Sequence, residues 1–279
     1  MYGIDIVQIL IFSGINIITV LGLNLITGVT GQLSLGHSAF FSIGAYTSAL
    51  LMLMLGIPFW AALILAALMA GLIGGLFSVP ILRLRGDYLA IATLGFCEIV
   101  RVVLINLKVD INGRTKFLST SLSDIPRETT LILVLVLVVL AVLFMAAVER
   151  SKFGLALRSI REDEVASQMM GINIASHKIL SFAIGSAFAG LGGALYASYI
   201  TVISPGDFGF MRSIEMLCML VLGGMGSIVG VIAGTVVLTS IPEILREIQD
   251  YRMIMYGIVL ILMMVFRPRG LFGKIRVNV

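Results

Sequence analysis

The stretch Leu131–Val148, LILVLVLVVLAVLFMAAV, decides the fold class of this chain. It has no charged or hydrogen-bonding side chain, and about 20 apolar residues in a helix span the bilayer core. Of all residues, 59% are hydrophobic and only 12% are charged, whereas an average soluble domain is about 25% charged. The sequence therefore predicts an all-α polytopic integral membrane protein, with residues 1–279 as a single transmembrane domain.

Other apolar runs predict further membrane helices. Besides 131–148, they cover residues 6–26, 38–55, the run from the turn at 56–58 to residue 79, 88–107, 179–203 and 253–266. Residues 211–241 form two shorter apolar pieces. Together these runs predict about eight or nine transmembrane helices.

Two Gly-rich stretches interrupt the apolar pattern, at 28–37 and at 223–230, one in each half of the chain. Interrupted hydrophobic segments in corresponding halves are typical of transporters whose substrate site lies where two repeats meet. The alternative is that these glycines only let helices pack closely. We expect broken or re-entrant segments at both positions, and the sequence leaves both explanations open.

Basic residues set the expected orientation in the membrane. Lys and Arg accumulate in the loop at 149–178 and after residue 266, and cytoplasmic loops of membrane proteins are enriched in both. This loop and the C-terminus are therefore predicted to be cytoplasmic, and the N-terminus to lie outside. Residues 211–241 must then cross the membrane twice or dip in and return. The same rule explains the net charge of +4, which does not indicate nucleic acid.

The loop at 149–178 carries its own helix signal. Ser159 followed by Glu162 is a capping box, acidic residues occupy the next positions, and Gly171 suits a left-handed residue after a helix end. The sequence thus predicts a short helix near 160–170. It is either an amphipathic helix on the lipid surface or a docking helix for a cytoplasmic partner. The acidic start disfavours anionic headgroups, so we favour docking.

Two pairs of opposite charge lie in apolar surroundings. Glu98 and Arg101 are three residues apart in a predicted span, and Arg212 and Glu215 repeat this spacing near the start of the later apolar pieces. Side chains three apart on a helix can pair, and charges inside a membrane are costly when unpaired. A structural ion pair is the simplest interpretation of both.

The first Gly-rich stretch also holds Gln32, Ser34 and His37, which are candidates for lining a polar path. A lone histidine beside a helix start is more often a structural hydrogen-bond partner. A serine close to a histidine does not by itself give nucleophile and base geometry. The chain has no phosphate-binding loop ending in lysine and no metal-binding motif. We therefore predict no catalytic residue, metal or cofactor of its own.

Several blocks in order resemble LivM-type permeases, the membrane subunits of ABC importers for branched-chain amino acids. Residues 22–47 read GLNLITGVTGQLSLGHSAFFSIGAYT and look like the N-terminal signature of that family. Further similar blocks follow nearly to the end of the chain: RLRGDYLAIATLGFCE at 83–98, GIN at 171–173, GGALY at 192–196, GGMGS at 223–227 and RPRGLFG at 267–273.

The resemblance implies a multi-pass protein in the cell (inner) membrane of a bacterium or archaeon. Its expected partners are a LivH-type permease chain, two cytoplasmic ATPase subunits that bind the ATP, and an extracytoplasmic substrate-binding protein. The helix near 160–170 would then be the coupling helix that fits a cleft on an ATPase.

Specific residues follow from this interpretation. We expect coupling to depend on Arg161, Glu162, Asp163, Glu164, Val165 and Gly171, and the pathway to involve Gln32, Ser34, His37 and Ser227. One alternative is an ion-coupled secondary transporter that uses the carboxylate of Glu98. Another is a urea-type ABC permease of the same family, because the signatures overlap.

Overall fold

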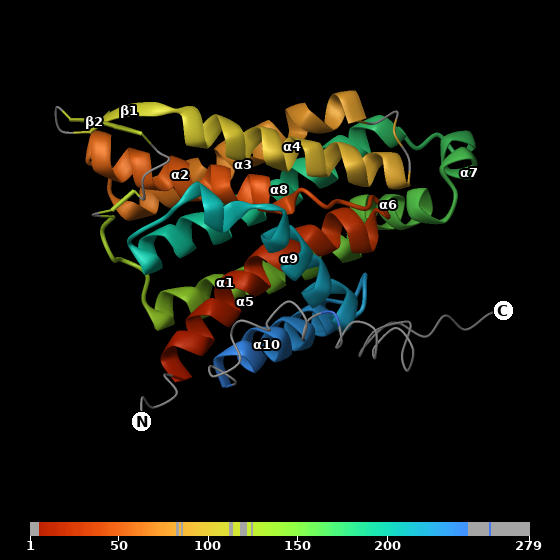
Figure 1. Cartoon of the computed structure of the whole chain (residues 1–279). Coiled ribbons are helices and arrows are strands. Elements are labelled where there is room, and N and C mark those ends of the chain that lie inside the picture. The colour runs from red at the N-terminus through yellow and green to blue at the C-terminus, as the bar shows by residue number, and fades with distance from the viewer. Residues whose placement is uncertain are drawn as a thin grey trace.

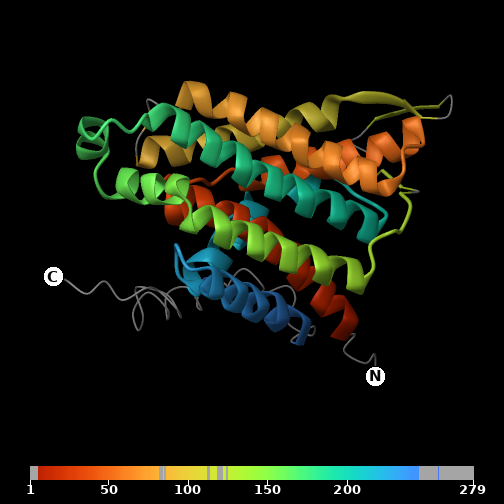
Figure 2. The same ribbon diagram turned by 180° about the vertical axis from the view of Figure 1, so that it is seen from behind.

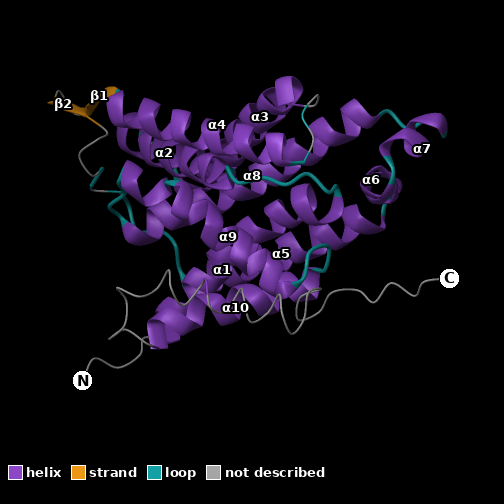
Figure 3. Ribbon diagram, turned by 45° about the vertical axis from the view of Figure 1, so that its right-hand side comes forward, coloured by secondary structure: helices purple, strands orange, loops and turns teal. Residues whose placement is uncertain are grey.

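The computed structural model describes residues 6–81, 84, 86–111, 114–117, 122–123, 125–244 and 257. Most of this part of the chain is helical, as the apolar runs predict (Figure 3). Six helical segments are long and apolar enough to cross a membrane, at 6–29, 37–55, 59–81, 87–106, 131–150 and 174–200. The last predicted span, 253–266, lies outside the described residues apart from Gly257.

In chain order, the described helices and strands begin at Ile6 and end at Ile244. The elements are α1 Ile6–Leu23, the π-helix η1 Asn24–Val29, α2 His37–Leu55, α3 Phe59–Ile81, α4 Asp87–Asn106, β1 Lys108–Ile111, β2 Arg114–Phe117, α5 Leu131–Arg150, α6 Lys152–Glu162, α7 Glu164–Met169, α8 Ile174–Ile200, the 3-10 helix η2 Pro205–Phe208, α9 Phe210–Gly223 and α10 Ile228–Ile244.

The long helices form a bundle with two distinct ends. The short helices α6 and α7 lie at one end, and the antiparallel β1–β2 hairpin lies at the other (Figures 1 and 2). We call these the α6–α7 end and the hairpin end. Helices suit a lipid environment because they satisfy every backbone polar group internally.

Helix α8 packs against α1, α2 and α3 (Figure 2). Glycines make this close packing possible. A Cβ atom on Gly22 of α1 would overlap the carbonyl oxygen of Gly185 in α8, and a Cβ on Gly44 of α2 would overlap the backbone of Gly190. Small residues at helix interfaces let backbones approach closely in membranes, where helix association depends on van der Waals contact.

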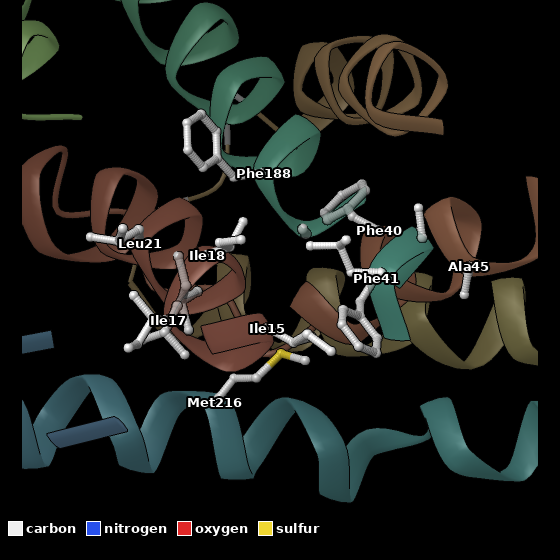
Figure 4. Close-up of a cluster of buried hydrophobic side chains, with 14 of the residues drawn as sticks. Ile15, Ile17, Ile18, Leu21, Phe40, Phe41, Ala45, Phe188 and Met216 are labelled. Atoms are coloured by element: carbon white, nitrogen blue, oxygen red, sulfur yellow. The ribbon is translucent and has the colours of Figure 1, made fainter. Parts of the chain in front are cut away.

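Bulky side chains fill the space between the glycine contacts. Figure 4 shows one cluster to which α1, α2, α8 and α9 all contribute. The labelled members are Ile15, Ile17, Ile18 and Leu21 from α1, Phe40, Phe41 and Ala45 from α2, Phe188 from α8 and Met216 from α9. This cluster joins both halves of the chain into one core.

Helices α4 and α5 contribute little to that core. Only 22% of the apolar window of α4 and 17% of that of α5 are buried within the chain. Their outer faces carry large hydrophobic side chains such as Ile99 and Leu143, which are 62% and 61% exposed. These faces are therefore available to lipid or to another membrane protein.

Candidate functional site

The first Gly-rich stretch takes the chain out of helical structure inside the bundle. Helix η1 ends at Val29, residues 30–36 are not helical, and α2 begins at His37. Threonine side chains satisfy backbone carbonyls at this break. Thr27 Oγ1 donates to the carbonyl of Gln32 at 3.0 Å, and Thr30 Oγ1 donates to that of Leu25 at 2.8 Å. Buried irregular backbone requires such internal partners.

The second break separates α9 from α10. Helix α9 ends at Gly223, and the turn that follows contains Gly224 and Gly226 with φ angles of 108° and 85°. Residues with a side chain rarely adopt this left-handed backbone. Ser227, a predicted pathway residue, accepts a hydrogen bond from the N–H of Gly230 at 3.2 Å and so caps the first turn of α10.

The two breaks touch each other. The side-chain oxygen of Asn24 accepts a hydrogen bond from the N–H of Gly226 at 2.8 Å. A Cβ atom on Gly28 would lie 2.6 Å from the backbone nitrogen of Gly226, closer than real side chains approach. Backbone segments from the two halves of the chain are therefore in direct contact at this point.

Arg161 joins the α6–α7 loop to this contact. Its guanidinium donates a hydrogen bond to the carbonyl of Gly28. Its Cγ lies 2.9 Å from the position that a Cβ on Gly31 would occupy, and its Nη1 lies 3.2 Å from the equivalent position at Gly226. The sequence assigned Arg161 to coupling but contained no sign that it reaches both breaks.

The predicted bounds of the helix near 160–170 are wrong. Helix α6 ends at Glu162. Asp163 has an extended backbone, with φ −153°, and separates α6 from α7, which begins at Glu164. The capping box at Ser159 does not form, because this residue lies inside α6 and its hydroxyl lies 2.7 Å from that of Ser167. Asp163 caps α7 instead, accepting hydrogen bonds from the N–H groups of Val165 and Ala166 at 2.8 and 3.0 Å.

One prediction for this loop, the left-handed residue after the helix end, is confirmed. Gly171 has φ 82°, as expected for a left-handed residue after a helix. Glu164 forms an ion pair of 2.6 Å with Lys178 of α8, whose side chain is only 5% exposed. Val165 and Met169 of α7 point outward, with exposures of 57% and 83%. The loop is thus anchored to the bundle and presents an apolar surface at the end of the molecule.

The predicted pathway residues are divided between the two breaks, which contact each other. Gln32, Ser34 and His37 are buried along the first break, and His37 Nε2 lies 3.1 Å from the carbonyl of Thr19. Gln32 Oε1, Ser34 Oγ and His37 Nδ1 are buried without a hydrogen-bond partner among the described residues. Ser227 belongs to the other break and follows Gly226, whose N–H donates to Asn24.

A second junction, missed by the sequence analysis, joins the starts of α2 and α9. Ser38 N–H donates to Ser213 Oγ at 3.0 Å, and the Ser38 hydroxyl donates to the carbonyl of Gly209 at 3.2 Å. The sulfur of Cys97 in α4 lies 3.0 Å from the same hydroxyl. The available signal was the position of serines at the starts of apolar runs, where side chains commonly satisfy free backbone groups.

Both predicted ion pairs are present and line one pocket of about 490 Å³. Arg101 Nη1 lies 3.2 Å from Glu98 Oε2, and Arg212 Nη1 lies 2.9 Å from Glu215 Oε2. Arg212 also donates to the side-chain oxygen of Asn16 in α1 at 3.0 Å. The pairs come from α4 and α9, so their shared pocket follows from the tertiary fold and not from their spacing in sequence.

Membrane-length helices, interrupted helices in both halves and a polar pocket define a multi-pass membrane protein of the transporter class. No group of three or more His, Cys, Asp or Glu side chains in the described part could hold a metal ion. The chain matches, over residues 5–264, the family described as branched-chain amino acid transport system / permease component. It therefore belongs to that family.

Individual relatives agree with this assignment. The chain is 38% identical to the high-affinity branched-chain amino acid transport system permease protein LivM of Escherichia coli, across 97% of this chain and 70% of the relative. It is 27% identical to BraD of Pseudomonas aeruginosa, with 91% and 90% covered, and 24% identical to LivH of Escherichia coli, with the same coverage. No solved structure matches the chain.

Proposed function

We propose that this chain is the transmembrane permease subunit of an ABC importer that carries branched-chain amino acids. Family membership and the names of its LivM, BraD and LivH relatives support the substrate class. The contact of Arg161 with Gly28 is the observation that most directly supports a coupling mechanism, because it links a surface loop to the break in the transmembrane bundle. The permease supplies a gated path and no chemistry.

Four kinds of partner complete the proposed importer. A LivH-type chain forms a heterodimer with this one, two cytoplasmic ATPase subunits bind and hydrolyse ATP, and an extracytoplasmic protein delivers the substrate. The sequence contains no phosphate-binding loop of its own. The exposed apolar faces of α4 and α5 offer surface for the second permease and for lipid.

The proposed orientation places the α6–α7 end in the cytoplasm of a bacterial or archaeal cell, with the N-terminus outside and the C-terminus inside. The basic residues of the loop at 149–178 support this side. Helices α9 and α10 would then add an even number of passes, either two crossings or one re-entrant pair. Added to the six candidate spans and the last predicted span, two crossings give nine transmembrane helices, whereas a re-entrant pair leaves seven crossings.

In the proposed coupling step, ATP binding closes the ATPases and pushes on α7 and the end of α6. Glu162, Asp163, Glu164 and Val165 lie at this corner, and Gly171 ends the unit. Arg161 transmits the displacement to the contact between the two breaks. Packed helices respond to such a push by rocking as rigid bodies between discrete arrangements.

The ion-coupled alternative receives less support from the geometry. It requires a buried carboxylate that is available to an ion. Glu98, the candidate for that role, is paired with Arg101 at 3.2 Å, and its side chain is 38% exposed. A carboxylate already paired with a guanidinium is a poor site for a driving cation, because the cation must compete with Arg101.

The test is to purify the tagged chain from its native membrane in mild detergent and to identify co-purifying proteins by mass spectrometry. We expect a second permease and two ATPases with phosphate-binding loops. The purified complex, reconstituted with its binding protein, should then accumulate labelled leucine in vesicles only when ATP is supplied. Recovery of the chain alone, while a known membrane complex survives the same procedure, would favour the ion-coupled transporter. Accumulation of urea in place of leucine would identify the urea-type permease.

A further inference from the structure

We propose that the pocket between α4 and α9 binds the charged ends of the transported amino acid during its passage. The pocket holds two Arg/Glu pairs from elements far apart in sequence, and its volume of about 490 Å³ lies within the roughly 300–1,000 Å³ typical of small-molecule sites. This inference rests on the proposed transport function and adds the site at which the substrate is held.

The groups for a carboxylate gather at the start of α9. Arg101 Nε is buried without a hydrogen-bond partner among the described residues, and it lies 3.9 Å from the position that a Cβ on Gly209 would occupy. Gly209 is the N-cap of α9, and no side chain caps this helix start. Arginine binds carboxylates through charge-assisted hydrogen bonds, and the helix start adds partial positive charge.

The groups for an ammonium are the acidic members of the same pairs. Glu98 and Glu215 line the pocket, and so does Asp207, whose carboxylate also accepts the N–H of Ser204 at 2.9 Å. A zwitterion can insert into an Arg/Glu pair because it offers each partner a charge of the opposite sign. A solute with a single charge would leave one partner of the pair unmatched, which is costly at the Arg212–Glu215 pair, whose side chains are only 15% and 6% exposed. The mixture of charges therefore favours a zwitterion over a simple anion or cation.

Apolar side chains complete the pocket. Phe210 and Met211 at the start of α9 and Tyr196 of α8 line it together with the charged residues. A branched aliphatic side chain can pack against these groups while its charged ends meet the ion pairs. The pocket thus offers complementary chemistry to both halves of a branched-chain amino acid.

Helix α9 connects this pocket to the coupling contact. Its first residues line the pocket, and its last residue, Gly223, leads into the turn where Gly226 meets Arg161. At 1.5 Å per residue, the 14 residues of α9 span about 21 Å. A displacement at the Arg161 contact therefore moves α9 as one rigid helix, and the pocket-lining residues at its start move with it.

The experiment measures whether substrate occupies the pocket. In the complete importer, Met211→Cys places a thiol on the pocket lining, where Met211 is 55% exposed. L-leucine should slow its alkylation by a charged thiol reagent at least threefold. Isopentylamine and 4-methylpentanoate, which each lack one charge of leucine, should not. Val202→Cys, 43% exposed and outside the pocket lining, is the matched control. The native Cys97 and Cys218 are buried, so the unmodified complex serves as the blank.

A second variant separates binding from folding. Arg101→Gln should abolish the protection by leucine and lower ATP-driven leucine uptake about tenfold, while Arg127→Gln should leave both unchanged. Arg127 lies over the ring of Tyr199 at 5.0 Å and is absent from the pocket lining. Equal alkylation with and without leucine, in a complex that transports leucine normally, would overturn the pocket assignment and leave the proposed function intact. Absence of ATP-driven uptake in the unmodified complex would overturn the proposed function itself.

Discussion

Arg161 of α6 donates a hydrogen bond to the carbonyl of Gly28 in η1, across 133 positions of sequence. The same side chain packs on Gly31 and approaches Gly226 in the turn between α9 and α10. One residue at the α6–α7 end therefore contacts the interrupted backbone of both halves of the chain. This arrangement suits a residue that transmits movement from a docking loop to the transmembrane helices.

Arg161→Gln should uncouple transport from ATP hydrolysis. The variant loses the charged donor to Gly28, and hydrogen bonds to charged groups contribute about 1.5–3 kcal/mol, so we expect uptake to fall on the order of tenfold. Leucine uptake and ATP hydrolysis should be measured in the same vesicles. Lys152→Gln, at the exposed start of α6, is the control and should transport normally. A proportional fall in uptake and hydrolysis would argue against a specific transmission role.

Charge reversal at Glu162 tests the docking surface. Glu162 is the last residue of α6 and is exposed beside the corner at Asp163. Glu162→Lys should leave membrane insertion and heterodimer formation intact but remove ATP-driven uptake, because the ATPase then meets the wrong charge. Gly171→Pro should have the same outcome, since proline cannot adopt the φ of 82° found there. Normal uptake by a well-expressed Glu162→Lys protein would refute the coupling assignment.

Asp163→Ala should loosen α7 without unfolding the bundle. Loss of an N-cap costs about 1 kcal/mol, and α7 has only 6 residues with which to compensate. Amide hydrogen exchange within α7 should therefore accelerate about fivefold, whereas exchange in α8 should not change. Asp163→Asn retains a capping oxygen and serves as the matched control. Unchanged exchange in Asp163→Ala would show that the remaining contacts of α7, the Glu164–Lys178 ion pair and the contact of the Ser167 hydroxyl with Ser159, are sufficient to order it.

The sequence predicts the long helices well because each one depends on a local run of apolar residues. The run at 131–148, for example, corresponds to α5, Leu131–Arg150. The local pattern does not predict a helix start correctly where two capping signals compete. Ser159 and Asp163 both precede acidic or polar residues that suit a helix start, and the structure shows that α6 continues through Ser159 and that Asp163 is the cap.

Contacts between segments that are distant in sequence are harder to predict than helix boundaries. Spacing identifies the Glu98–Arg101 and Arg212–Glu215 pairs, since each lies within a single turn of one helix. Their meeting in one pocket depends on how α4 and α9 pack, which a single sequence does not encode locally. For the same reason the sequence does not show that Ser227 lies next to the contact of Gly226 with Asn24 and Gly28.

Two glycines in different helices provide a final test of the packing. A Cβ atom on Gly193 of α8 would overlap the carbonyl oxygen of Phe41 in α2, whereas a Cβ on Gly95 of α4 meets nothing within 4 Å. Gly193→Ala should therefore force α2 and α8 apart and destabilise the protein by about 1–3 kcal/mol. Gly95→Ala should stabilise it by roughly 0.5–1 kcal/mol, because alanine loses less backbone entropy in a helix. Thermal unfolding of both variants in detergent should shift the midpoint in opposite directions, and equal shifts would contradict the close approach of α2 and α8.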